Sequence, residues 1–375
     1  MSHASIDRSQ VEIDLGHMRA ALALARRGLG TVWPNPAVGC VIVNGGRVVG
    51  RGWTQPGGRP HAETEALAMA GDAARGATVY VTLEPCAHHG KTPPCAEALI
   101  KAGITRAVVA VQDPDDRVAG KGVAMLARAG IKVVEGMLEA EATELNAGFF
   151  QRVGTGRPLV TLKLASTLDG RIATHSGESK WITGEPARMA SHLLRAENDV
   201  IMVGSGTALH DDPDLTCRLN GLEEHSPVRV VVDGRLRLPL TSRLVATAND
   251  IPTWVLTLDG CDPARREAFE DAGVDVVEIP AGARGSIDLE LALQALSESG
   301  VTRVLVEGGA HLSAALLQAG LVDRLIWFRS PRIMGGDGLP AAQAFGIDHL
   351  AQTPRFERMD IRPVGDDVME TYSRL

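Results

Sequence analysis

The 375-residue chain is poor in aromatic residues and in cysteine, and it has no excess of basic charge. Aromatic side chains make up only 3% of the sequence, so its cores must depend on Ala, Val, Leu and Ile. A formal net charge of −8 argues against non-specific nucleic-acid binding, although it allows a local basic pocket for a phosphorylated substrate. The cysteines number five, which is no disulfide framework and leaves at least one thiol unpaired. We therefore expect a protein of the reducing cytoplasm, with no nucleic-acid partner and with thiols available as metal ligands.

Long apolar runs are also missing from the chain. No stretch approaches the roughly 20 apolar residues that span a bilayer. The first residues, MSHASIDRSQVEID, have no apolar run behind a basic start, so we expect neither a secretory signal nor a membrane partner. The chain is too long for one ordinary core and suits two domains, with 45% hydrophobic and 22% charged residues, as in ordinary globular proteins.

Helical and strand-like segments alternate along the chain. Helical patterns such as IDLGHMRAALALARRG and HAETEALAMAG are separated by strand patterns such as TVYVTLEP and RAVVAVQDP, and Asn44-Gly45-Gly46 predicts a hairpin turn. The sequence RVGTGRP, at 152–158, has the composition of a linker, and the alternation restarts after it. We predict two α/β domains, 1–153 and 154–375, the first with helices on both faces of a central sheet.

Three residues of the first domain form a candidate metal site. His61 opens a helical pattern, Cys86 follows a strand pattern, and Cys95 begins another helical pattern; both cysteines are expected at helix N-termini, where the dipole favours the thiolate. One imidazole and two thiolates suit tetrahedral zinc and leave a fourth position for water, as a catalytic site requires. Glu63 is then placed to take a proton from that water and return it to a leaving amine. A structural zinc with His88 or His89 as fourth ligand stays open as an alternative.

The order of these residues is that of a zinc deaminase, H-x-E followed by P-C-x-x-C, except that eight residues separate the two cysteines. The motif PCAHHGKTPPC follows TVWPNPAVG and HAETEAL in the sequence. Together these motifs resemble the deaminase half of the bifunctional riboflavin-biosynthesis deaminase–reductase, over most of residues 10–150. Further along, LKLASTLDGRIA, SGESKWITG, LLRAENDVIMVGSGT, DDPDLTCR and VEGGAHL resemble the reductase half over roughly 158–335. The resemblance implies a cytidine-deaminase-like first domain, a dihydrofolate-reductase-like second domain, and Zn²⁺ and NADPH as cofactors.

The resemblance also implies substrate-binding residues in the first domain. Asn35, in the proline-framed WPNPAVG, should bind the substrate near its sugar. Independently of the resemblance, His88, His89 and Lys91 lie in a loop bounded by glycine and proline beside the metal site, where their side chains suit a substrate phosphate. An ordinary solvated loop is the alternative for the segment with His88 and Lys91. The family's DPNP is replaced here by DPDD at 113–116, which puts a substrate role for that turn in doubt. The remaining cysteines are expected to be packing residues: Cys40, Cys217 and Cys261.

In the second domain the residues alone give a weaker signal. Glycines at two strand ends suit either phosphate binding or tight turns, and G-x-G-x-x-L lacks the third glycine of the dinucleotide fingerprint. By resemblance, the NADPH cleft should be lined by Ala165, Trp181, Thr207, Asp211, Gly308 and Gly309. The substrate should be faced by Lys163, Ser179, Arg195, Arg218 and Glu307. No residue stands out for the 2′-phosphate of NADPH.

Reduction of the ribosyl group needs proton transfers, for which we nominate Lys163, Asp211 and Glu307. Arg195 and Arg218 suit a phosphate, since guanidinium binds its oxygens bidentately. Ordinary alternatives exist, because Asp169-Gly170 and Asp212-Pro213 suit turns and Arg195 suits an ion pair on a helix face.

The function expected from these features is two consecutive steps of riboflavin synthesis. The first is hydrolytic deamination of 2,5-diamino-6-(5-phosphoribosylamino)pyrimidin-4(3H)-one, and the second is NADPH reduction of the ribosyl group to ribityl. The resemblance further suggests a homo-oligomer. Three alternatives remain: deamination of another nucleoside, nucleobase or tRNA base beside an appended nucleotide-binding domain, a zinc-stabilised nucleotide-binding scaffold without catalysis, and a chain with one degenerate domain.

Overall fold

The computed structural model describes residues 8–89, 93–115, 118–282 and 285–375. The chain divides into two compact units, one ending at Gly156 and the other running from Arg157 to Leu375. Among the described residues, no helix has the length and apolar character needed to cross a membrane. Each unit is described by itself below.

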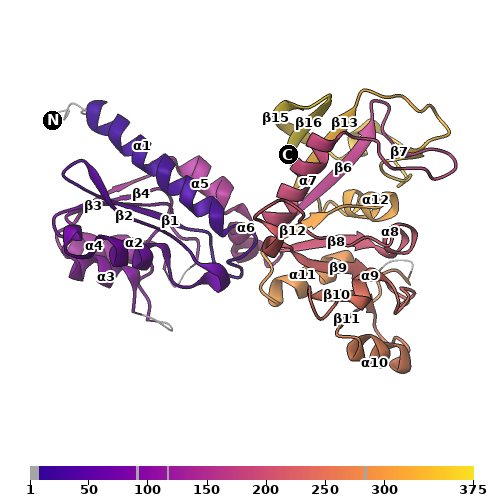
Figure 1. The fold of residues 1–375 in the computed structure, drawn as a ribbon, viewed down its shortest axis with the longest axis horizontal. Helices are drawn as coiled ribbons and strands as arrows, with labels where there is room; N and C mark the ends of the chain where they lie inside the picture. The colour runs from indigo at the N-terminus through magenta and orange to yellow at the C-terminus, as the bar shows by residue number, and fades with distance from the viewer. Residues whose placement is uncertain (1–7, 90–92, 116–117, 283–284) are drawn as a thin grey trace. The chain divides into compact units, whose positions relative to one another are not determined.

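The first unit is built around a five-stranded sheet in the order β2-β1-β3-β4-β5 (Figure 1). Its strands are β1 (Gly39–Asn44), β2 (Arg47–Trp53), β3 (Thr78–Val81), β4 (Arg106–Val109) and β5 (Lys132–Glu135). β1 is antiparallel to β2 and β3, whereas β3, β4 and β5 are parallel. The hairpin predicted at Asn44-Gly45-Gly46 is confirmed, because Gly45 and Gly46 connect β1 to β2 with φ of 54° and 75°.

Helices cover both faces of this sheet, as predicted. They are α1 (Arg8–Ala25), α2 (Ala62–Ala70), α3 (Cys95–Lys101), α4 (Lys121–Arg128), α5 (Glu139–Leu145) and α6 (Ala147–Thr155). Gly39 of β1 packs directly against the backbone of α1, whereas Gly50 and Gly52 of β2 pack against α2. Since Gly52 pairs with Cys40, which points to the face opposite Gly39, α1 and α2 lie on opposite faces. In Figure 1, α3 and α4 lie on the side of α2.

Two local expectations differ from the structure. The linker predicted at 152–158 is helical as far as Thr155, and the helix ends at Gly156, whose φ of 74° is the left-handed conformation that glycine adopts without strain. Cys86 follows β3 in a loop rather than at a helix N-terminus, because the chain does not turn into a helix until Cys95. Amino-acid composition alone did not distinguish a helix end from a linker at 152–158, or a loop from a helix N-terminus at Cys86.

The second unit contains a nine-stranded sheet in the order β11-β10-β9-β8-β12-β6-β13-β16-β15. The strands from β11 to β13 in this order are parallel, and β16 and β15 add an antiparallel edge. Their bounds are β6 (Leu159–Thr167), β8 (Val200–Gly204), β9 (Val228–Val232), β10 (Thr253–Leu258), β11 (Asp275–Ile279), β12 (Arg303–Val306), β13 (Arg324–Ser330), β15 (Phe356–Val364) and β16 (Asp367–Arg374). A small separate ladder pairs β7 (Arg171–Ala173) with β14 (Leu339–Pro340).

The central parallel strands of this unit are apolar and buried, as strands covered on both faces must be. The helices are α7 (Glu185–Ala196), α8 (Ser205–Asp211), α9 (Arg243–Ala246), α10 (Pro263–Asp271), α11 (Leu289–Glu298) and α12 (Ala310–Gln318). α8 begins directly after β8, and α12 begins a few residues after β12. Because the carboxyl ends of parallel strands share one edge of the sheet, the loops that open these two helices lie at the same edge.

Candidate active sites

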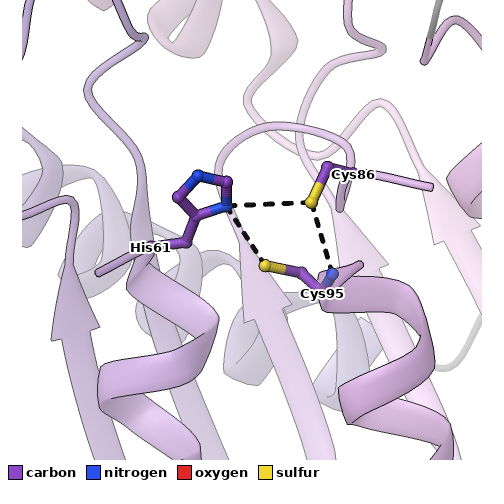
Figure 2. A group of neighbouring side chains, drawn as sticks. All are labelled: His61, Cys86 and Cys95. Carbon is purple, nitrogen blue, oxygen red and sulfur yellow. Dashed lines mark hydrogen bonds between the residues drawn. The ribbon is translucent and has the colours of Figure 1, made fainter. Parts of the chain in front are cut away.

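His61, Cys86 and Cys95 lie together in the first unit (Figure 2). His61 precedes α2, Cys86 lies after β3, and Cys95 is the first residue of α3. His61 Nδ1 lies 3.3 Å from Cys95 Sγ and 3.7 Å from Cys86 Sγ. The three ligand atoms all fall within 4.8 Å of one another. The structure thus brings together the three residues predicted as metal ligands.

This geometry fits a zinc ion. Zn–S bonds of about 2.3 Å and Zn–N bonds of about 2.0 Å at tetrahedral angles place N and S roughly 3.5 Å apart, which the two observed separations bracket. Hydrogen bonds from Cys95 and His61 outweigh burial and lower the pKa of the Cys86 thiol to about 4. Cys95 has a raised pKa because it donates to Cys86, so metal binding must release its proton. Neither His88 nor His89 joins the cluster among the described residues, so the alternative of a closed structural site has no support here.

Glu63 is the second residue of α2 and is 4% exposed. Burial and the neighbouring Cys86 thiolate raise the pKa of its carboxyl to about 7. A carboxyl group with a pKa near neutrality can both accept and donate a proton at working pH. The position and the titration of Glu63 therefore suit the proton carrier that the sequence predicted.

A cavity of about 240 Å³ opens beside the cluster. Asn35, His61, Glu63 and His88 all line it, so the structure brings these predicted residues into one space. His88 Nδ1 is buried and has no hydrogen-bond partner in the structure, which leaves it available to a ligand. Lys91 lies outside the described residues. The walls also include side chains that the sequence did not nominate: Arg59, Asp113, Asp115, Phe149 and Arg152.

Glu84 is a buried carboxylate whose role sequence reasoning missed. Its Oε1 accepts from the backbone N–H groups of Gly122 (2.8 Å) and Val123 (3.1 Å), and its Oε2 accepts from Gly120 (2.9 Å) and Asp113 (3.4 Å). It therefore caps the first turn of α4 and ties the loop that carries Asp113 to the segment between β3 and Cys86. The acidic residue in TLEPC was the only signal in the sequence, and it names no partner.

In the second unit, Lys163, Arg195 and Glu307 form a buried charge cluster. Arg195 binds Glu307 bidentately, with Nε 2.7 Å from Oε1 and Nη2 2.8 Å from Oε2. Lys163 Nζ lies 4.0 Å from Glu307 Oε2. Burial opposes ionisation of Glu307, but the Arg195 and Lys163 charges outweigh it and lower its pKa to about 2. Burial lowers the pKa of Lys163, while Glu307 acts in the opposite direction.

Arg195, for which the sequence offered a phosphate contact or an ion pair on a helix face, forms an ion pair with Glu307. Its Nη1 donates to Thr216 O at 2.8 Å, so each of its three nitrogens is already bonded within the protein. Arg218 has a 55% exposed side chain, paired loosely with Asp214 at 3.6 Å. Arg218 is therefore the better placed of the two arginines to meet a phosphate.

The residues predicted for NADPH occupy several elements near this cluster. Thr207 lies in α8 with its hydroxyl close to Gly309, and Gly204 N–H donates to Gly308 O at 3.0 Å. Trp181 is 60% exposed, with the Arg188 guanidinium 4.7 Å above its ring. Ala165 lies in β6, beside Phe328 of β13.

Two further predicted residues lie on other elements than the cluster. Ser179 lies in the loop between β7 and α7. Asp211 ends α8 and makes no hydrogen bond or ion pair with Lys163 or Glu307 in the described parts of the chain.

A larger cavity of about 680 Å³ lies at the carboxyl ends of β8, β9 and β10. It is lined by apolar residues of these strands and of α11 and α12, and by Gly204, Ser205, Gly206, Arg235 and Arg237. The sequence did not nominate either arginine, because the cavity forms only where separate strand ends meet. A cavity of this size and place is typical of nucleotide sites in α/β proteins.

The comparisons with known proteins agree with both units. Residues 11–111 match the cytidine and deoxycytidylate deaminase zinc-binding region, and residues 158–369 match the RibD C-terminal domain. The chain is 44% identical over 363 residues to the riboflavin biosynthesis protein RibD of Escherichia coli, covering 94% of this chain and 97% of that protein. RibD of Aquifex aeolicus is 41% identical, covering 97% of this chain and 99% of that protein.

Solved structures show the same similarity over nearly the whole chain. Acinetobacter baumannii RibD superposes with a TM-score of 0.87 at 41% identity, covering 98% of this chain and 100% of that chain. A deaminase/reductase of Thermotoga maritima superposes with a TM-score of 0.85 at 35% identity, again covering 98% and 100%. The predicted two-domain α/β architecture is thereby confirmed.

The fold and its sites define a two-domain enzyme that joins a zinc-dependent deaminase domain to an NADPH-dependent reductase domain. The resemblance noted in the sequence is confirmed by relatives of nearly equal length. The chain belongs to the RibD family of riboflavin biosynthesis proteins.

Proposed function

We propose that the chain catalyses the two reactions named for its Thermotoga maritima relative, a diaminohydroxyphosphoribosylaminopyrimidine deaminase and 5-amino-6-(5-phosphoribosylamino)uracil reductase. The observation that carries the proposal is the presence of both polar sites in one chain. One is the metal cluster with buried Glu63, and the other is the buried Lys163–Glu307 pair. The full-length similarity to RibD proteins supports both halves.

In the first reaction, zinc bound by His61, Cys86 and Cys95 would lower the pKa of a bound water to about 7. Water adds to the ring carbon that bears the 2-amino group. Glu63 takes a proton from that water and delivers it to the departing nitrogen, so that the C–N bond breaks and ammonia leaves. The raised pKa of Glu63, about 7, suits this double use of one carboxyl group.

The cavity beside the cluster suits a polar, phosphorylated substrate. We assign Asn35 to the sugar end of the substrate and the unpartnered Nδ1 of His88 to its phosphate. The role of Lys91 at the phosphate stays a prediction from its charge and its place in the sequence. Asp113 and Asp115 also line the cavity, which favours a substrate contact by the turn whose sequence departs from the family's DPNP.

In the second reaction, NADPH would supply the hydride that C1′ of the ribosyl group accepts. The sugar ring must open first, which requires a proton on the ring oxygen and removal of one from the exocyclic nitrogen. We assign Lys163 as the acid, since burial lowers the pKa of its ammonium group and so favours proton release. Glu307, ionised and 4.0 Å away, orients Lys163 and balances its charge.

The remaining predicted residues take supporting roles in this proposal. Arg195 is a positioning residue that fixes the Glu307 carboxylate, and Arg218 takes the phosphate. Ser179 stays a predicted substrate contact, and Ala165, Trp181, Thr207 and the Gly308-Gly309 turn stay predicted neighbours of NADPH. Asp211 keeps its predicted place at the cofactor, but its lack of contact with Lys163 and Glu307 favours no proton-transfer role.

Paired variants of the full chain separate the two reactions. Glu63→Gln should release no ammonia from the diaminopyrimidine phosphate while its zinc content stays near normal. The same variant, given 5-amino-6-(5-phosphoribosylamino)uracil, should oxidise NADPH at the rate of the unaltered protein. Lys163→Met should show the reverse pattern, with normal ammonia release and little NADPH oxidation. Persistent deamination by Glu63→Gln would remove Glu63 from the mechanism, and full reduction by Lys163→Met would remove Lys163.

Two further features stay predictions: assembly as a homo-oligomer, from the resemblance, and residence in the cytoplasm, from the low cysteine content. The outermost strand β15 supports the first, because it forms an exposed sheet edge with Met359 and Ile361 62% and 51% exposed. An exposed edge strand of this kind is a surface that another chain can cover. Sedimentation of the purified protein would test the assembly, and a single monomeric species at micromolar concentration would contradict it.

A further inference from the structure

The large cavity of the second unit has a chemically divided lining. Its inner wall is apolar, formed by Val232, Leu258, Ile287, Leu312 and Ala315. The rest of its lining comes from the glycine-rich start of α8, from the segment directly after β9, and from Gly285, Ser286, Leu289 and His311. An apolar slot beside a backbone free of bulky side chains suits a flat base and its sugar.

Two arginines stand on the segment after β9. Arg235 and Arg237 are both exposed, and both line the cavity. Between them, Leu236 is 3% exposed and packs into the core, whereas both arginine side chains are exposed at the cavity wall. A local pair of positive charges is distinctive in a chain whose net charge is −8.

Arg237 is held in place by two polar contacts. Its Nη2 donates to Ser205 Oγ at 2.6 Å, which links the segment after β9 to the first residue of α8. Its Nε lies 3.6 Å from Oδ1 of Asp233, a fully buried carboxylate whose other oxygen accepts from Leu238 N–H at 2.8 Å. Oδ1 itself has no hydrogen bond in the structure. Arg237 is therefore preorganised by a buried acid, which lowers the entropy that a ligand contact must overcome.

Arg235 differs from its neighbour, because it makes no hydrogen bond or ion pair with any residue that the structure describes. One guanidinium is thus fixed and the other is free to close on a ligand. Guanidinium groups bind phosphate oxygens through paired N–H donors, and two of them suit a dianionic monoester better than a bridging diester. A ligand with a base, a ribose and a phosphate monoester on that ribose matches the whole cavity.

We propose that Arg235 and Arg237 form the subsite that binds the 2′-phosphate of NADPH and so select NADPH over NADH. This inference rests on the proposed reductase function and adds the residues that set its cofactor preference. The adenine would lie against the apolar wall, and the phosphate would lie between the two guanidinium groups. NADPH and NADH differ only in the 2′-phosphate, so contacts from the two arginines to this phosphate strengthen the binding of NADPH and not that of NADH.

The test is direct binding of NADPH and of NADH to the full-length protein, measured by calorimetry in the absence of substrate. The unaltered protein should bind NADPH more tightly than NADH. Arg235→Gln and Arg237→Gln should each weaken NADPH binding about tenfold and leave NADH binding nearly unchanged, as expected for loss of one charge-assisted phosphate contact. Arg266→Gln provides the control, because it removes an arginine charge on α10, outside the cavity, and should change neither affinity.

Each other outcome counts against the proposal in a distinguishable way. Arg237→Gln also removes the contacts to Ser205 and Asp233, so equal weakening of NADPH and NADH binding in this variant would show a structural effect of those contacts. Arg235→Gln removes no such contact. An unchanged NADPH affinity in Arg235→Gln would therefore overturn the subsite. Equal affinity of the unaltered protein for NADPH and NADH would overturn it as well, while leaving the reductase function intact. Binding of neither dinucleotide by the unaltered protein would overturn the cofactor assignment of the domain and the subsite together.

Discussion

Replacing Arg195 by Met should destabilise the second domain and stop reduction, because it leaves Glu307 buried without its main partner. The two side chains are only 13% and 10% exposed, and two hydrogen bonds join them. Breaking one side of a buried ion pair costs about 3–5 kcal/mol. For a domain of this size, that loss corresponds to a fall of about 6–20 °C in unfolding temperature.

The pH dependence of this loss has a definite sign. The pKa of Glu307 is lowered from 4.5 to about 2 in the folded chain, so its ionised form stabilises the fold above pH 4.5 and this contribution declines as the pH falls toward 2. The difference between the unaltered protein and Arg195→Met should therefore be largest near pH 7. At pH 3.5 it should be smaller by about 1 kcal/mol, since one pH unit below the unfolded pKa corresponds to about 1.4 kcal/mol.

Calorimetry of the full chain with and without zinc separates the domains, because only the deaminase transition should move with the metal. Arg195→Lys is the matched variant, which keeps the charge, loses the bidentate geometry and should show an intermediate loss. A change below about 1 kcal/mol in Arg195→Met, with NADPH oxidation intact, would refute the account of the cluster.

Removal of zinc by a chelator should abolish ammonia release and lower the unfolding temperature of the first domain. Oxidation of NADPH with 5-amino-6-(5-phosphoribosylamino)uracil should continue. Loss of both activities together would contradict the independence of the two sites. Replacing Glu84 by Gln should destabilise the first domain by about 1–3 kcal/mol, because the charge and one of the acceptors for the first turn of α4 are lost. As a positioning residue, Glu84 should affect KM for the diaminopyrimidine more than zinc content, measured by metal analysis. Unchanged KM with normal stability would show that the cap is unimportant.

The metal site was predictable because its ligands lie in short, recognisable sequence blocks. His61 and Glu63 are separated by one residue at the start of a helix, and each cysteine is framed by proline. Such local patterns carry the identity of the ligands and the chemistry that those ligands perform. The structure added the mutual approach of Nδ1 and the two sulfur atoms.

The polar network of the second domain was predictable only in part, because its partners are far apart in the sequence. Arg195 and Glu307 are separated by 112 positions, so the sequence did not show that one saturates the other, and Arg195 was assigned to a phosphate. Glu84 and the cavity with Arg235 and Arg237 were missed for the same reason. Each depends on which strand ends the topology brings together, which no local pattern specifies.

The linker prediction shows a different limit. Glycine and proline between 152 and 158 indicated a break, yet α6 continues to Thr155 and the chain leaves the helix at Gly156. Gly154 within the last turn is tolerated because a single glycine costs a helix only about 1 kcal/mol. Composition therefore located the region of the break within a few residues but not the helix end itself.

The central claim is that one chain performs deamination and then reduction. The purified, zinc-loaded protein should be given the diaminopyrimidine phosphate and NADPH, with ammonia and NADPH oxidation followed separately over time. Ammonia release that precedes NADPH consumption, with equal final amounts of each, is the result that the account predicts. NADPH consumption without ammonia, or neither signal from protein shown to contain zinc, would contradict it.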